Sequence, residues 1–254
     1  MKKISFIIII LAAALAYVYA GGDMESGNIV STERTFGQFD SIKAGSNGTV
    51  NFHESPEYRA TIAMDSGTID YLDIYTSGSC LNIGIKPGHP FFFGKYNIDV
   101  YCPTLSTVNL SGSVQFKGID KIKAGDFSLK MSGSGKADGD FECSSFSLNV
   151  SGSVNINGNV ASRNFSADLS GSSRIKLAGQ TDDMDIRISG STIFNGKDLQ
   201  SKNTQISASG SSNMDVWVLD NLKTQVTGSG RIRYRGNPKI DNHSSGSASL
   251  ENIT

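Results

Sequence analysis

A Ser-Gly-Ser motif recurs through the C-terminal half of this chain and constrains its fold more than any other feature. The first copy is Ser111-Gly112-Ser113, and seven more follow, one of which has Thr227 in the first position. Their glycines are 21, 19, 19, 19, 20, 18 and 18 residues apart. A nearly fixed period of this length indicates stacked units of one supersecondary type. The turn glycines are Gly112, Gly133, Gly152, Gly171, Gly190, Gly210, Gly228 and Gly246.

Each repeat unit has the hydrophobic pattern of two short strands joined by the glycine turn. In the third copy, residues 146–150 alternate apolar and polar, Ser-Gly-Ser follows, and residues 154–157 alternate again. A period of two is typical of a strand with one buried face. Glycine suits the turn because it adopts positive φ without a Cβ clash, and small serines let turns stack. We expect a strand, a tight turn, a second strand and a looser turn, with serine hydroxyls bonding local backbone groups.

A single unit of this kind is too small to fold alone. It buries about five apolar side chains, each of which contributes roughly 1.5–3 kcal/mol. Ordering about 19 residues costs roughly 1–2 kcal/mol per residue in backbone entropy. The units must therefore stack as coils around a shared core, which is a β-solenoid. An antiparallel sandwich is the alternative, but the regular period and the repeated turn favour the solenoid.

The first 20 residues have the pattern of a secretory signal peptide. Lys2 and Lys3 precede the apolar run 4–15, and Ala20 ends a small-residue cleavage site. An uncleaved membrane anchor is the alternative, although the run is short for a bilayer span. We expect an exported protein, located in the periplasm, on the outer membrane surface or outside the cell. Residues 21–34 are expected to form a flexible lead.

The composition agrees with an exported β protein that has no cofactor. Without Lys2 and Lys3 the chain has 23 − 2 = 21 basic and 24 acidic residues, so nucleic acid is not an expected partner. Cys80, Cys102 and Cys143 make no disulfide framework. We expect three buried, unpaired thiols, with one disulfide as the alternative. No Cys/His spacing resembles that of a zinc site.

The remaining chain, residues 35–254, is expected to form one solenoid domain with two parts. Residues 35–103 contain strand-like alternation at irregular spacing, including an out-of-period Ser-Gly-Ser at 77–79. They are predicted to be the first coils and to cap the open end. Residues 104–254 carry the regular repeat, and the copy at Gly246 belongs to the final coil.

The order of these segments resembles the putative auto-transporter adhesin head GIN-domain family of exported bacterial proteins. The resemblance starts at residues 39–42, a glycine turn and residues 50–52, and continues through 81–83 and 101–105 into the Ser-Gly-Ser repeats. It covers about residues 36–250. It implies a right-handed, pectin-lyase-like parallel β-helix with the turns between its sheets and a role in adhesion. It supplies no catalytic residues.

Candidate catalytic residues are few. His53, His89 and His243 lie far apart in the sequence and have no nucleophile motif around them. We therefore expect them to be surface histidines.

Two acidic groups offer alternatives to that interpretation. Asp182, Asp183 and Asp185 are expected to be solvated turn residues between strands, and the alternative is a calcium or sugar site, since calcium binds clustered carboxylate oxygens. Asp138 and Asp140 would be the carboxylate pair of a glycosidase, which requires a defined separation that sequence does not supply.

Three consecutive aromatic residues, Phe91, Phe92 and Phe93, form the most unusual local feature. They cannot all face one core in an alternating strand. We expect a packed cap over the core, with a contact patch for a partner subunit, a glycan or a membrane as the alternative. Exposed edge coils together with this patch predict self-association into a homo-oligomer.

Three classes of function follow from these observations. The first is a non-enzymatic adhesin-like or structural module that binds a surface glycan or an envelope protein. The second is a carbohydrate-active lyase or hydrolase on the same fold, since fold does not decide function. The third is a periplasmic scaffold or regulatory partner. The first is preferred because the sequence has no evident catalytic constellation.

Overall fold

The structure is a computed structural model that describes residues 28–88 and 94–253. The predicted signal peptide, His89 and the patch Phe91–Phe93 lie outside the described residues. Within the described ranges the chain forms 17 strands and one 3-10 helix, with no α-helix. The elements are β1 (Ile29–Thr35), β2 (Ser41–Ala44), β3 (Asn47–Glu54), β4 (Arg59–Asp65), η1 (Ile69–Tyr71), β5 (Leu72–Ser77), β6 (Cys80–Ile85), β7 (Tyr96–Cys102), β8 (Thr107–Gly118), β9 (Ile122–Gly133), β10 (Lys136–Gly152), β11 (Asn155–Gly171), β12 (Arg174–Gly190), β13 (Ile193–Gly210), β14 (Asn213–Gly228), β15 (Arg231–Arg235), β16 (Lys239–Gly246) and β17 (Ser249–Asn252).

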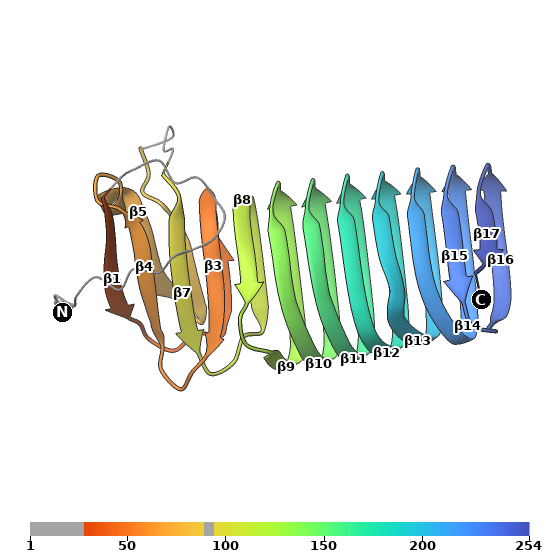
Figure 1. Ribbon diagram of the computed structural model, residues 1–254, viewed down its shortest axis with the longest axis horizontal. Helices are drawn as coiled ribbons and strands as arrows, with labels where there is room; N and C mark the ends of the chain where they lie inside the picture. The colour runs from red at the N-terminus through yellow and green to blue at the C-terminus, as the bar shows by residue number, and fades with distance from the viewer. Residues whose placement is uncertain (1–27, 89–93, 254) are drawn as a thin grey trace.

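The regular half is a β-solenoid whose coils stack in parallel. β10 pairs with β11 from Lys136 opposite Asn155 to Gly152 opposite Gly171, so each residue lies beside the one 19 positions later. Figure 1 shows β8 to β17 following one another along a single axis. The solenoid has about eight turns, and the predicted all-β solenoid fold is confirmed.

The looser turn of each unit is part of a continuous strand, because its backbone is hydrogen-bonded to the neighbouring coils. The sequence pattern instead predicts two separate strands on either side of this turn. β10 to β14 are 16 to 18 residues long and follow the chain around this corner. Between β10 and β11 the strand is interrupted by just two residues, Ser153 and Val154. Register shifts between β12, β13 and β14 occur at 176–178, 196–200 and 201–203, away from the Ser-Gly-Ser corner. The unequal repeat lengths are therefore absorbed at the looser corner.

At the Ser-Gly-Ser corner, each turn packs directly on the turn of the preceding coil. Gly152 has φ of +130°, and a Cβ at this position would lie 2.3 Å from the carbonyl oxygen of Gly133. The Ser153 amide donates to that same oxygen over 2.8 Å. The Ser170 hydroxyl donates to the Val150 carbonyl of the preceding coil over 3.1 Å, rather than to a local group as expected.

The stack of turns begins one coil before the first Ser-Gly-Ser motif of the sequence, at residue 46. Ser46 has φ of +76° and is the one described non-glycine residue with positive φ. The Ser113 amide donates to the Ser46 carbonyl over 2.8 Å, as later turns do to glycine carbonyls. Ser46 therefore occupies the position of the turn glycines in the first turn of the stack.

The interior is a set of stacked rows of side chains, one row for each inward position of the coil. Phe127, Phe146 and Phe165 form one row, with ring centroids 5.5 Å apart at each step. Leu129, Leu148 and residues equivalent to them form the next row. These side chains are buried, so the stacked coils share a continuous core.

The N-terminal part folds back on itself instead of adding coils in chain order. β2 lies between β6 and β8, and β3 lies between β7 and β8, all in parallel. Beyond them, β5 pairs antiparallel with β6, and β4 pairs antiparallel with both β7 and β1. The out-of-period Ser-Gly-Ser at 77–79 joins the β5–β6 hairpin. Figure 1 places β1 at this end of the solenoid.

The predicted flexible lead, residues 21–34, is wrong for residues 29–34, which belong to β1. The strand pairs with β4 from Ile29 opposite Asp65 to Thr35 opposite Arg59. Most of its side chains are exposed. Backbone hydrogen bonds to β4 therefore hold this strand in place. A pattern of apolar and polar residues does not reveal such bonds.

The last described coil differs from the others in the residues it directs inward. Asn242 and Ser244 continue the rows that contain Leu148 and Val150 in β10. The hydroxyl of Thr224, which is buried in the preceding coil, donates to Asn242 Oδ1 over 2.7 Å, whereas Asn242 and Ser244 themselves are exposed. Ile240 continues the phenylalanine row but is 42% exposed. The row of core residues thus becomes polar at this end.

Replacing Gly152 with valine should lower the free energy of unfolding by about 3 kcal/mol or more, because a β-branched side chain would sit at positive φ against a carbonyl oxygen. Denaturant unfolding followed by circular dichroism measures this change. Gly125→Val is the matched control, since no atom lies within 4 Å of a Cβ at Gly125. Ser151→Ala should have a small effect. Equal stability of all three variants would contradict the turn mechanism.

Candidate functional site

The outward side of strands β10 to β14 is a continuous polar surface, which we call the polar face. Along β10 the residues Phe146, Leu148 and Val150 are buried, so the residues between them point outward. The register places four such positions on each of the five strands. These positions are all polar: Ser145, Ser147, Asn149, Ser151, Asn164, Ser166, Asp168, Ser170, Asp183, Asp185, Arg187, Ser189, Asn203, Gln205, Ser207, Ser209, Asn221, Lys223, Gln225 and Thr227.

Two open hollows lie on the polar face. Hollow A, of about 470 Å³, lies beside the Ser-Gly-Ser corner and extends from Asp168 to Thr227. Hollow B, of about 440 Å³, lies toward the looser corner and extends from Ser145 to Lys223. The ion pair between Arg187 of hollow A and Asp185 of hollow B stands where they adjoin.

Hydrogen bonds between coils hold the side chains of the polar face in rows. Asn203 Nδ2 donates to Asp183 Oδ1 over 2.8 Å, and Asn221 Nδ2 donates to Asn203 Oδ1 over 2.7 Å. Arg187 also lies 3.6 Å from Asp168. Because each coil repeats the same position, these amide and carboxylate groups bond from one coil to the next.

The acidic group at 182–185 lies within β12 and not in a turn between strands, so that expectation is wrong. Asp182 pairs with Lys202 over 2.7 Å, and this contact raises the pKa of the Lys202 ammonium group. Asp183 and Asp185 have the separate partners Asn203 and Arg187. The three carboxylates are thus directed to three different groups. Among the described residues, no cluster of His, Cys, Asp or Glu has metal-binding geometry.

Asp138 and Asp140 each bind the next coil. Asp138 Oδ1 accepts from Asn157 Nδ2 over 2.9 Å, and Asp140 Oδ1 accepts from Asn159 Nδ2 over 2.7 Å. Neither carboxylate lines hollow A or hollow B. Their visible role is to tie β10 to β11.

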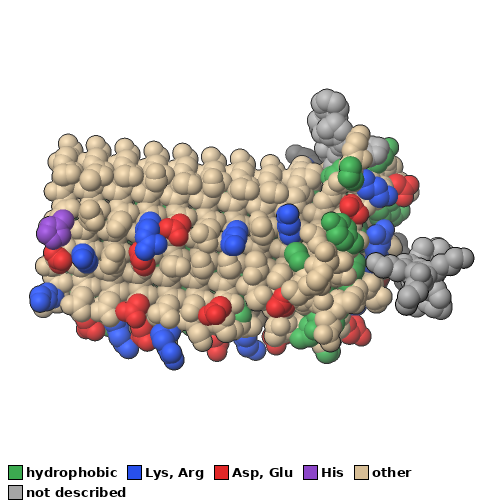
Figure 2. All heavy atoms as spheres, turned by 180° about the vertical axis from the view of Figure 1, so that it is seen from behind, with side chains coloured by type: hydrophobic (Ala, Val, Ile, Leu, Met, Phe, Trp, Pro, Cys, Tyr) green, Lys and Arg blue, Asp and Glu red, His purple; other side chains and the backbone are tan. Residues whose placement is uncertain are grey.

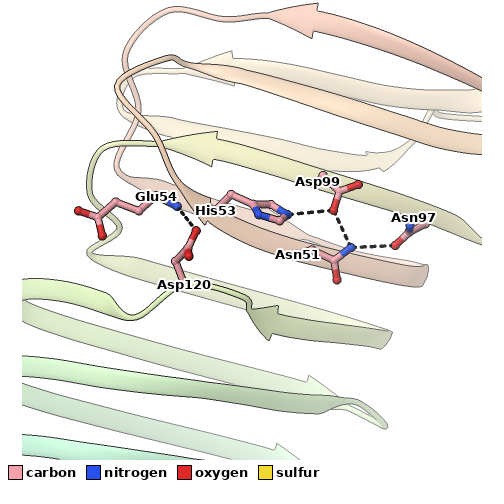
Figure 3. Close-up of polar contacts among 6 residues, drawn as sticks. All are labelled: Asn51, His53, Glu54, Asn97, Asp99 and Asp120. Carbon is pink, nitrogen blue, oxygen red and sulfur yellow. Dashed lines mark hydrogen bonds and ion pairs between the residues drawn. The ribbon is translucent and has the colours of Figure 1, made fainter. Parts of the chain in front are cut away.

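His53 belongs to a polar cluster on the N-terminal coils, which Figure 3 shows. Its Nε2 lies 3.1 Å from Asp99 Oδ1, and Asn51 Nδ2 donates to the same oxygen over 3.0 Å. The His53 ring stacks on Tyr101 at 4.7 Å, and the Arg59 guanidinium covers the same tyrosine ring at 3.6 Å.

This cluster was missed in the sequence because its members are remote from one another. Asn51 is 4% exposed, and it also donates to Asn97 Oδ1 over 3.0 Å. The contacts join β3 to β7, which are more than 40 residues apart in the chain. The cluster therefore fixes the fold-back of the N-terminal part. His243, in contrast, is an exposed histidine 2.9 Å from Asp241.

All three cysteines are free thiols, as expected. Cys102 is buried, while Cys80 and Cys143 are half-buried. Burial, with a smaller effect of Asp40, raises the pKa of the Cys102 thiol to about 12. Burial and then Asp126 raise the pKa of the Cys143 thiol to about 11, and burial also raises the pKa of Cys80. The thiols are thus protonated near neutral pH.

A family model described as "putative auto-transporter adhesin, head GIN domain" matches residues 38–238. The chain belongs to this family. The family resemblance predicted from the sequence is therefore confirmed, and the match spans the fold-back, the polar face and all but the last of the repeated turns.

Solved structures share the fold of this GIN domain. A putative lipid-binding protein from Parabacteroides distasonis ATCC 8503 is 24% identical, with a TM-score of 0.84 over 90% of this chain and 98% of that one. A putative adhesin from the same strain is 22% identical, with a TM-score of 0.83 over 89% and 98%. A putative adhesin from Parabacteroides merdae ATCC 43184 is 20% identical, with a TM-score of 0.79 over 90% and 98%. At these identities the likeness establishes the fold alone.

A comparison of the GIN-domain chain with curated proteins finds no match. Across residues 28–88 and 94–253, no helix has the length and hydrophobicity needed to cross a membrane.

The raised thiol pKa values predict slow alkylation of the native protein. At pH 8, Cys102 and Cys143 should react with iodoacetamide at least about a hundredfold more slowly than an ordinary cysteine, whose pKa is about 8.5. Peptide mass spectrometry measures each site, with the urea-unfolded chain as the control. Because the folded thiols keep protons that the unfolded chain releases, stability should fall as the pH rises from about 8.5 toward 11. Rapid native labelling of Cys143 would contradict this account.

Proposed function

We propose that this chain is an exported, non-enzymatic, adhesin-like module that binds a partner through the side of its solenoid. The observation that carries the proposal is the polar face, in which 20 outward positions on five strands are all polar and held in register. A rigid, repetitive surface of this kind suits binding of an extended partner.

The family description supports an adhesive role, since it names an auto-transporter adhesin head. Two of the similar solved structures are also described as putative adhesins, although their low identity carries no functional weight alone. The putative lipid-binding neighbour raises lipid as a ligand. The polar face favours a polar ligand instead, because its outward side chains are all polar, whereas the apolar residues beside the hollows, such as Phe146, Phe165 and Leu169, are buried in the core.

Export is part of the proposal and is supported by the first 20 residues, with their basic start, apolar run and small-residue cleavage site. The family supports the same location, because an adhesin acts at a surface.

The enzymatic alternative has weaker support. A glycosidase requires two carboxyl groups that face one substrate bond. Asp138 and Asp140 instead accept hydrogen bonds from the neighbouring coil, and both lie away from the hollows. A scaffold role in the envelope would use the same surfaces, and co-purification with one envelope protein would favour it.

Expression of the full chain in a Gram-negative host tests export and adhesion together. The periplasmic product should lack about 20 N-terminal residues, and Ile8→Arg should prevent export because it places a charge in the apolar run. Beads coated with the exported protein should adhere to bacterial or epithelial surfaces at least tenfold more than albumin-coated beads. Intact mass and bead counts are the measurements.

Absence of adhesion to every surface would contradict the proposed function. Reproducible sugar release from polysaccharides that vanishes in Asp138→Asn or Asp140→Asn would move the assignment to a carbohydrate-active enzyme.

Self-association remains a prediction. β1 and β5 are edge strands at the N-terminal end, and exposed edges tend to pair with another chain. Tyr75 on β5 is 49% exposed and would be covered by such a contact. Analytical ultracentrifugation over a concentration series should detect oligomers, whereas monomer alone at high concentration would refute the prediction.

A further inference from the structure

The two hollows of the polar face adjoin across the same strands and form one elongated surface. Hollow B crosses β10 to β14, and hollow A crosses β11 to β14. Neighbouring strands are about 4.8 Å apart, so the four steps from β10 to β14 span about 19 Å. A ligand that uses the whole surface is therefore extended and lies along the solenoid axis.

The lining of the hollows offers hydrogen-bonding groups at every coil. Ser147 and Ser166 are half-buried in hollow B, and Ser207 is half-buried in hollow A. Asn203 and Gln205 add amide groups beside them. Hydroxyls and amides both donate and accept hydrogen bonds, which is the requirement for binding ligand hydroxyls that do the same.

The charges of the hollows nearly cancel. Asp168, Asp183 and Asp185 supply three carboxylates, and Arg187 and Lys223 supply two cations. Arg187 pairs with both Asp168 and Asp185. Figure 2 shows charged side chains of both signs spread along the flank of the molecule, without one sign gathering in a single patch. A polyanion or a polycation would find no strong field here.

Other extended ligands fit this surface poorly. The 20 outward positions of the polar face hold no apolar side chain, so an acyl chain or an amphipathic helix would find no exposed apolar side chain to pack against there. β11, β12 and β13 are each paired on both sides, so a peptide cannot add to them as a further strand. The remaining chemistry is extended, uncharged and rich in hydroxyls.

Building on the adhesive function proposed above, we propose that the polar face binds a linear neutral polysaccharide that lies across β10 to β14. One coil meets each successive stretch of the ligand, so the repeat of the protein matches a repeat in the sugar chain. Hydrogen bonds from hollow B hold one edge of the chain, and those from hollow A hold the other.

Asp185 marks the centre of this binding surface. Its Oδ2 pairs with Arg187, while its Oδ1 is shielded from solvent and has no hydrogen-bond donor among the described residues. An acceptor left without a donor is unfavourable. The side chain is 35% exposed, so a rotation would present Oδ1 to a ligand hydroxyl. Ligand binding would thereby satisfy a group that the folded chain leaves unpaired.

The test measures retention of the exported full chain on immobilised neutral polysaccharides, namely a β-glucan, an α-mannan and a xylan, with polygalacturonate as the anionic comparison. Ser166→Trp fills hollow B and should weaken retention on the bound polysaccharide at least tenfold. Asn157→Trp is the matched control and should leave retention unchanged. Asn157 is exposed on the same strand as Ser166, but it lies on the other side of the looser corner and lines neither hollow.

A second variant removes donors without adding bulk. Gln205→Ala combined with Lys223→Ala changes two exposed side chains of hollow B and should also weaken retention at least tenfold. Circular dichroism and melting temperature establish that each variant is folded. If Ser166→Trp unfolds, the double variant decides the outcome.

Three results would overturn the inference. These are no retention on any neutral polysaccharide, stronger retention on polygalacturonate or on phosphatidylcholine vesicles, and equal retention of the hollow variants and Asn157→Trp. The bead assay separates the two proposals. Adhesion that survives the hollow variants leaves the adhesin function standing and rejects the polar face as its binding surface, whereas loss of adhesion in the wild-type chain rejects the adhesin function itself.

Discussion

The contact between successive Ser-Gly-Ser turns governs the rest of the structure. Each turn glycine lies so close to the carbonyl of the preceding turn that a Cβ would overlap it, as the 2.3 Å distance at Gly152 shows. The following serine amide bonds the same carbonyl. This corner therefore has one permitted geometry, and the register of both flanking strands follows from it. The register shifts between β12, β13 and β14 lie toward the looser corner, while the Ser-Gly-Ser corner keeps its register.

A fixed corner also explains why the polar face is regular. Since the coils cannot slip, inward rows align with inward rows, and Phe146 meets Phe165 in the core. The outward positions align equally well, so Asp183, Asn203 and Asn221 form a connected ladder. The same constraint that builds the core thus orders the polar face, and a surface ordered in advance loses little entropy when it binds an extended partner.

The regular half was predictable from sequence because its information is local and repeated. Period, alternation and turn residues all indicated a β-solenoid, and the family match agrees. The fold-back of the N-terminal part was not predictable, because it depends on contacts such as His53 with Asp99, 46 residues apart. β1 is held by backbone pairing that hydropathy does not detect. The hollows were not predictable either, because their lining residues come from four or five strands at once.

The polar side chains at the core-row positions of the last described coil have a consequence for assembly into fibres. A solenoid whose final coil continued the rows of Leu148 and Val150 would offer a template for the next molecule, and head-to-tail addition would generate filaments. Here Asn242 and Ser244 occupy those rows, and Asn242 already accepts a hydrogen bond from Thr224. An added coil would have to strip water from these groups without replacing it. These two positions therefore disfavour addition of a further coil at this face.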